Sequence, residues 1–166
     1  ARLRALGRHE LSTLFVRKAG EEAGHDAWAL SDIEQLGFEA SALERECSFS
    51  AVDAYVAWAS YCVQLSPVAV LGIAWMLEWF GVCRAGPAAD AMTKNSGIPN
   101  ITRAVRFLRG HAEADGEHVQ SLVRALPLVT GPGEIEAVLL SARVTARLYT
   151  AFFDAAGGEL SPASSL

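Results

Sequence analysis

A long apolar segment that contains a single acid places the strongest limit on how this chain folds. Residues 66–83 (SPVAVLGIAWMLEWFGVC) are apolar except for Ser66 at the start and Glu78. An ionised carboxylate in apolar surroundings is costly unless it is paired or binds a cation. The segment approaches the length of a membrane span, yet it carries Glu78 and the chain has no second such segment. We therefore predict a core helix of a bundle, in which other helices supply the partner of Glu78.

The remaining periodic segments also predict helices, and no alternating pattern predicts a strand. We expect an all-α bundle that forms a single helical metal-binding domain over residues 1–166, with a frayed tail at about 157–166. The first expected helix runs from Leu3 or His9 to Leu36, with a kink near Leu30 and Gly37 as its stop. The others run over 50–65, over 66–83, over 87–94, from Asn100 or Ile101 to Ala125, and over 134–156.

Charge and cysteine usage exclude several classes of protein. The net charge of −5 and the pI near 5.3 leave no basic surplus for phosphates, so we expect no nucleic-acid partner. Residues 1–20 lack the apolar core of a signal peptide. The three cysteines, Cys47, Cys62 and Cys83, are odd in number and lack CxxC spacing. These features predict a cytoplasmic protein with buried thiols and no membrane partner.

Three of the four histidines lie in two short motifs. Residues 111–118 (HAEADGEH) place His111, Asp115 and His118 within about 60° of one another on a helix. Residues 21–26 (EEAGHD) separate Glu22 from His25 by three positions, which makes them neighbours on one helix face. Glu-x-x-His is the spacing with which di-iron and di-manganese carboxylate bundles present ligands inward. Both motifs therefore predict metal ligands.

The two motifs and the buried acid together supply three imidazoles and three carboxylates. This donor set, without thiolate, suits iron or manganese better than a structural zinc site. Six ligands exceed what one ion takes when positions stay open for oxygen or substrate, which favours two ions. The predicted metal ligands are Glu22, His25, Glu78, His111, Asp115 and His118.

Structural interpretations of the same residues remain open. A single histidine on a helix is more often a hydrogen-bonded core or surface residue than a ligand, and Glu78 could instead form a salt bridge with Arg103 or Arg143. His9 lies about 140° around a continuous helix from Glu22, so we do not expect it to be a ligand. Aromatic side chains at helical spacing could line a substrate pocket, but we interpret them as core: Trp28, Trp58, Trp75, Trp79, Tyr55 and Tyr61.

The chain resembles the haem-oxygenase-like di-iron oxidases and oxygenases, which are iron-containing redox enzymes. The likeness rests on the segments EEAGHDAWALSDIEQLG, LGIAWMLEWFG and FLRGHAEADGEH, and it extends from about Glu21 to Val119. The family pattern is a Glu and a His on one helix, a Glu about fifty residues later, and then His-x-x-x-Asp-x-x-His. The resemblance implies a haem-oxygenase-like bundle of seven helices, of which this chain lacks the first, and a homodimer.

The resemblance also implies an activity and assigns residues to it. Members bind two Fe(II) ions, take dioxygen as co-substrate and oxidise a small organic substrate, often in natural-product biosynthesis. The substrate is an amine, an amino acid or a carboxylic acid, and the reaction is N-oxygenation or oxidative C–H or C–C cleavage. The six predicted ligands match the family's ligand set, and Asp32 matches an acid that acts as an outer or auxiliary ligand. Lys18 departs from the pattern, because some members place a glutamate ligand there, one turn before Glu22.

Two other functions remain open. A metal-independent enzyme of the same fold, such as a thiaminase-like hydrolase or a quinone-cofactor oxidase, needs a nucleophilic cysteine or a cofactor cage. No cysteine of this chain has an obvious base beside it. The other possibility is a bundle that stores or carries metal without catalysis. The sequence leaves the identity of the substrate open.

Overall fold

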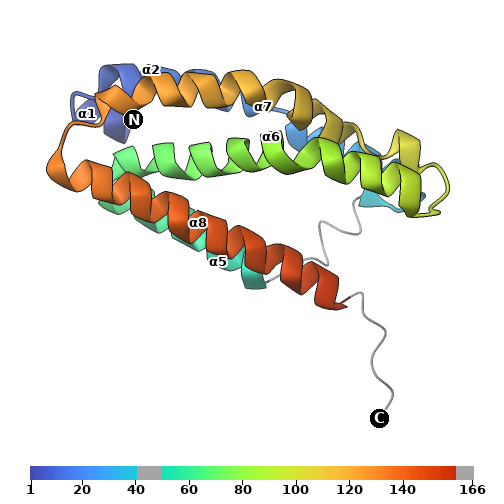
Figure 1. The fold of residues 1–166 in the computed structure, drawn as a ribbon. Coiled ribbons are helices and arrows are strands. Elements are labelled where there is room, and N and C mark those ends of the chain that lie inside the picture. The colour runs from blue at the N-terminus through green and yellow to red at the C-terminus, as the bar shows by residue number, and fades with distance from the viewer. Residues whose placement is uncertain (41–49, 160–166) are drawn as a thin grey trace, which may run out of the picture. The chain divides into compact units, whose positions relative to one another are not determined.

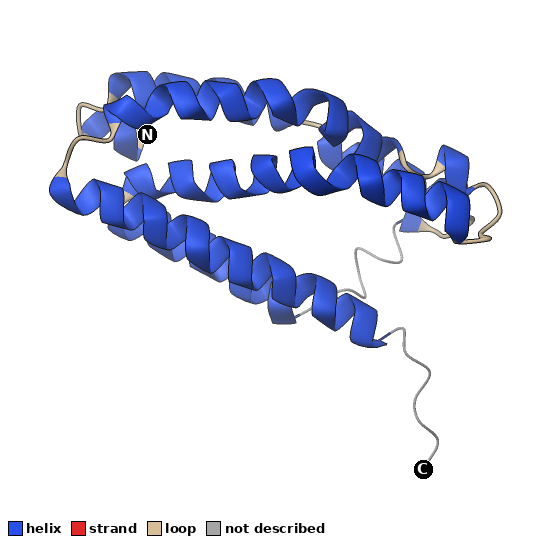
Figure 2. Cartoon of the chain, viewed as in Figure 1, coloured by secondary structure: helices blue, strands red, loops and turns tan. Residues whose placement is uncertain are grey.

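The computed structural model describes residues 1–40 and 50–159, and every regular element in these ranges is a helix (Figures 1 and 2). This confirms the predicted all-α class. The chain folds into two compact units, one made of Ala1–Cys47 and Leu77–Val129, the other of Ser48–Met76 and Thr130–Leu166. All predicted metal ligands belong to the first unit. A single domain over residues 1–166 stays a prediction.

The first unit is built around helices from both of its segments. Helix α3 (His25–Gln35) packs against α7 (Arg106–Ala125). The buried side chains of Ala89, Ile101 and Val105 form a small core with Leu36 and Leu108. The elements of this unit are α1 (Arg2–Ala5), α2 (His9–Glu22), α3 (His25–Gln35), the later part of α6 (Val70–Asn95), η2 (Ile101–Arg103), α7 (Arg106–Ala125) and η3 (Leu126–Leu128).

The second unit pairs α5 (Ser50–Leu65) with α8 (Pro132–Glu159), which lie side by side (Figure 1). The 3-10 turn η1 (Pro67–Ala69) starts at a proline, whose fixed φ suits a first helical turn. At the start of α6, Gly72 lies so close to the carbonyl oxygen of Val138 that a Cβ would overlap it. The Ser141 hydroxyl donates a hydrogen bond to the Ala69 carbonyl at 2.7 Å. Small residues thus allow these helices to pack closely.

The predicted helix that reaches Leu36 is in fact divided into α2 and α3. Helix α2 ends at Glu22, and Gly24 has a φ of 90° before α3 begins at His25. Glycine adopts this left-handed conformation without the steric cost that other residues incur, so the break comes at Gly24 and the expected kink near Leu30 was wrong. The predicted stop at Gly37 is confirmed, because its N–H donates to the Glu34 carbonyl at 3.0 Å.

The predicted break between Cys83 and Pro87 was also wrong. Helix α6 continues from Val70 to Asn95 with Pro87 inside it. A proline removes one backbone hydrogen bond and crowds the preceding turn, but Ala85 and Ala89 beside it are buried and their packing favours a continuous helix. Helix α8 continues to Glu159, past the predicted end. The rest of the tail, residues 160–166, lies outside the described residues.

One described segment, Pro67–Asn95, is long and apolar enough to cross a membrane by length and composition alone. Within it, Leu71 and Ala89 are fully buried, and the carboxylate of Glu78 has an ionic partner on another helix. Since a core helix satisfies the same criterion of length and composition, we interpret this segment as the core helix that the sequence predicts.

Candidate metal centre

Four helices of the first unit position the six predicted ligands. Glu22 is the last residue of α2 and His25 is the first residue of α3, so the short turn at Gly24 joins them. The sequence argument placed both on one helix face, and that premise was wrong although the two side chains do meet. Glu78 lies on α6, where it is buried. On α7, Asp115 is buried, while Glu113 and Glu117 are exposed.

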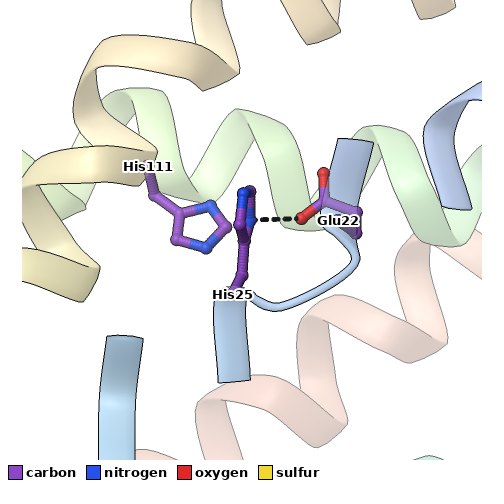
Figure 3. Close-up of side chains that lie close together, drawn as sticks. All are labelled: Glu22, His25 and His111. Atoms are coloured by element: carbon purple, nitrogen blue, oxygen red, sulfur yellow. Dashed lines mark hydrogen bonds and ion pairs between the residues drawn. The ribbon is translucent and has the colours of Figure 1, made fainter. Parts of the chain in front are cut away.

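The ligand atoms gather into two groups that share one carboxylate. Glu22, His25 and His111 form the first group, and Glu22, Glu78 and His118 form the second; within each group the ligand atoms all lie within 4.8 Å of one another. Figure 3 shows the first group, in which the His25 ring lies between the His111 ring and the Glu22 carboxylate. Two adjacent groups with a common carboxylate suit two ions. Neither group contains Asp115, whose role as a ligand stays a prediction.

Each of the three histidines faces a carboxylate through its Nδ1 atom. A carboxylate accepts a hydrogen bond from the imidazole N–H, which fixes the orientation of the ring. The hydrogen bond to Asp115, together with its negative charge, raises the pKa of His111, although burial opposes this. The Nδ1–oxygen distances are 2.9 Å for His25 and Glu22, 3.1 Å for His111 and Asp115, and 3.0 Å for His118 and Glu78.

Within the first unit, the ionic partner of Glu78 on another helix is Lys18 rather than Arg103, while Arg143 belongs to the second unit. The Lys18 ammonium on α2 contacts Oε1 of Glu78, and both residues are less than a tenth exposed. The same nitrogen lies 3.5 Å from Oε1 of Glu22. Burial raises the pKa of Glu78, and the Lys18 ammonium opposes this rise.

The donors of the two groups fit iron. Oε1 of Glu22 is buried and accepts no hydrogen bond from any residue that the structure describes. The Lys18 ammonium and Nδ1 of His118 each lie 3.5 Å from this oxygen without forming a hydrogen bond to it, and a bound cation would give it a direct partner. The donors are imidazole nitrogens and carboxylate oxygens without thiolate, a set that suits iron.

Aromatic residues cover one side of the first group. Trp28 stacks on His25 with 4.0 Å between ring centroids, and Phe107 lies 4.6 Å from His111. Gly110 allows this arrangement, since a Cβ there would approach Cζ3 of Trp28 to 2.5 Å. Trp28 therefore packs against a predicted ligand. The core interpretation was wrong for Trp79 and Tyr61, which are exposed.

Asp32 holds the start of α7 in place. It is buried, and its Oδ2 accepts a hydrogen bond from the backbone N–H of Phe107 at 2.8 Å. That N–H belongs to the first turn of α7, where backbone donors lack partners within the helix and negative charge is favourable. Neither ligand group contains Asp32, so its role as an outer or auxiliary ligand stays a prediction. The structure gives it a capping role that sequence spacing could not reveal.

Replacing Asp32 with alanine should lower the free energy of unfolding by about 1–2 kcal/mol, the usual effect of losing a helix cap. Urea denaturation of the metal-free protein measures this. Asp154→Ala, at an exposed position of α8, is the matched control and should change stability by less than about 0.5 kcal/mol. An equal loss in both variants would rule out the capping role.

The buried thiol of Cys62 lacks the features of a nucleophilic site. Cys62 is buried and donates to the Ala59 carbonyl at 3.7 Å. Burial raises its pKa, which keeps the thiol protonated and unreactive. Cys83 is exposed, against the prediction of buried thiols, and Cys47 lies outside the described residues. The thiaminase-like alternative thus gains no support from Cys62.

Comparison with known proteins gives one match. The model of a family described as iron-containing redox enzymes matches residues 1–150. No curated protein matches the chain, and no solved structure does.

Proposed function

Because this chain belongs to the family of iron-containing redox enzymes, we propose that it is a non-haem di-iron oxidase or oxygenase that uses dioxygen to oxidise a small organic substrate. The observation that carries the proposal is the pair of ligand groups that share Glu22. A structural metal site needs one group of ligands that fills every coordination position of a single ion. Two adjacent groups of three ligands leave coordination positions free, which suits a redox centre.

Six residues would hold the iron. Glu22, His25 and His111 supply one position, Glu22, Glu78 and His118 the other, and Asp115 lies against His111 as a further carboxylate. When bound, Fe(II) supplies the electrons that reduce dioxygen, which side chains alone cannot provide.

The chain's own groups would prepare this chemistry. The three imidazole–carboxylate hydrogen bonds fix the orientation of the histidines. The carboxylates compensate the charge of the ions. Trp28 and Phe107, packed against His25 and His111, limit the access of water to that side of the centre.

The substrate class follows from the resemblance of the three sequence motifs to the family pattern. We propose an amine, an amino acid or a carboxylic acid, oxidised by N-oxygenation or by oxidative C–H or C–C cleavage in natural-product biosynthesis. A cytoplasmic homodimer is part of the same proposal. A storage function would use the same ligands, so the test must measure reactivity rather than metal content.

Mixing the Fe(II)-loaded protein with dioxygen in a stopped-flow instrument tests the proposal. We expect a transient visible absorption band whose decay accelerates with at least one member of a panel of amines, amino acids and carboxylic acids. The metal-free protein is the control and should give no band. Slow oxidation without a transient, indifferent to every compound of the panel, would favour storage and contradict the oxygenase function.

A further inference from the structure

A buried lysine reaches the carboxylates of the candidate metal centre. Lys18 is 4% exposed, although lysine is almost never buried unless it is paired. Its ammonium contacts Oε1 of Glu78 and lies 3.5 Å from Oε1 of Glu22 and 3.7 Å from Oε2 of Glu21. The only other lysine of the chain, Lys94, is exposed.

The ammonium is associated with one ligand group more than with the other. Two of its three carboxylate partners, the partly exposed Glu22 and the buried Glu78, belong to the group that His118 completes. Of the group formed by Glu22, His25 and His111, it approaches only the shared Glu22. A fixed positive charge therefore lies within the second group, on the oxygens that an ion would need.

The net charge of the centre also favours binding of one ion over binding of two. With neutral imidazoles, the carboxylates of Glu21, Glu22, Glu78 and Asp115 carry four negative charges, and Lys18 brings the net charge of the centre to −3. One divalent ion would neutralise most of that charge. A second ion would leave an excess of positive charge in a largely buried site and would be repelled by the ammonium, an effect that water screens weakly there.

We propose that the Lys18 ammonium occupies the second cation position of the centre, so that the protein takes up its two ions in order. The first iron binds tightly to Glu22, His25 and His111. The second binds weakly to Glu22, Glu78 and His118, because it must displace the ammonium. This inference rests on the proposed function, which supplies the identity of the metal.

Anaerobic equilibrium dialysis against Fe(II) alone tests the proposal with Lys18→Met. The wild-type protein should show one tight and one weak site, and the variant should bind the second ion at least about tenfold more tightly, since a like charge a few ångströms away is removed. Lys18→Gln, which keeps a hydrogen-bond donor without the charge, should give the same result if the methionine variant fails to fold. Lys94→Met is the matched control and should bind as the wild type does.

A second measurement follows the melting temperature of each protein without and with Fe(II). The metal-free Lys18→Met protein should melt at a lower temperature than the wild type, because Glu78 loses its buried partner, and its gain on addition of iron should be larger. Two wild-type sites of equal affinity, or a second site unchanged in both Lys18 variants, would overturn the role of Lys18 and leave the di-iron function standing. Absence of any bound iron in the wild type would overturn both.

Discussion

Replacing Gly81 with alanine is expected to abolish iron binding and to lower the free energy of unfolding by about 2.5–6 kcal/mol. Gly81 lies on α6 against Asp115 of α7; a Cβ would overlap Oδ2 of that carboxylate and lie 2.8 Å from its Cγ. Overpacking a buried site costs about 1–3 kcal/mol. The added Cβ would displace Asp115, which would then lose its hydrogen bond with His111. A hydrogen bond to a charged group contributes about 1.5–3 kcal/mol to stability. Urea denaturation and iron analysis after anaerobic loading measure the two effects.

Gly86→Ala is the matched control on the same helix. A Cβ at Gly86 would meet only the Cβ of Ala112, at an ordinary 3.6 Å. This variant should retain its iron and gain up to about 1 kcal/mol, because alanine favours the helix. If Gly81→Ala bound iron as well as Gly86→Ala did, the close approach of α6 to Asp115 would not be required for the centre.

Replacing His111 with alanine should weaken binding of the first iron by more than about a hundredfold. His111 belongs to the group with Glu22 and His25, and even the hydrogen-bond partners of metal ligands contribute about 10- to 100-fold in affinity. The variant should also lose about 1–3 kcal/mol of unfolding free energy without metal, because Asp115, 2% exposed, is left without its imidazole donor. Anaerobic Fe(II) dialysis gives the affinity.

His9→Ala serves as the control for His111→Ala. His9 is exposed at the first residue of α2, so its removal should change neither iron binding nor stability by a measurable amount. Full retention of both irons in His111→Ala would show that the first ligand group is assigned incorrectly.

Local sequence patterns predicted the helices better than the places where helices break. Gly37 ends α3 as expected, because a glycine after an amphipathic segment is a strong local signal. The sequence predicted a continuous helix at Gly24, where the chain breaks, and a break before Pro87, where the helix continues. The break at Gly24 comes from a left-handed residue inside a pattern that otherwise favours a helix, and α6 tolerates Pro87 because packing around buried alanines outweighs one lost hydrogen bond.

Residues whose chemistry depends on spacing along one helix were predictable, as the inward face of α7 shows. Residues whose role depends on contacts between helices were not. Lys18 and Asp32 meet Glu78 and Phe107 from distant parts of the sequence, so only the packing of helices brings them together. Both contacts involve buried charge, and a lysine or aspartate on a helix is by default expected at the surface.

The first unit is discontinuous in sequence, since the segment Ser48–Met76 separates its two parts. Iron held by Glu22, His25 and His111 would therefore act as a cross-link between chain segments that are far apart in sequence. A cross-link of this kind restricts the unfolded chain more as the loop it closes becomes longer, and metal binding free energy is then also folding free energy. Insertions or deletions in the separating segment would change the length of that loop without moving a ligand out of its helix.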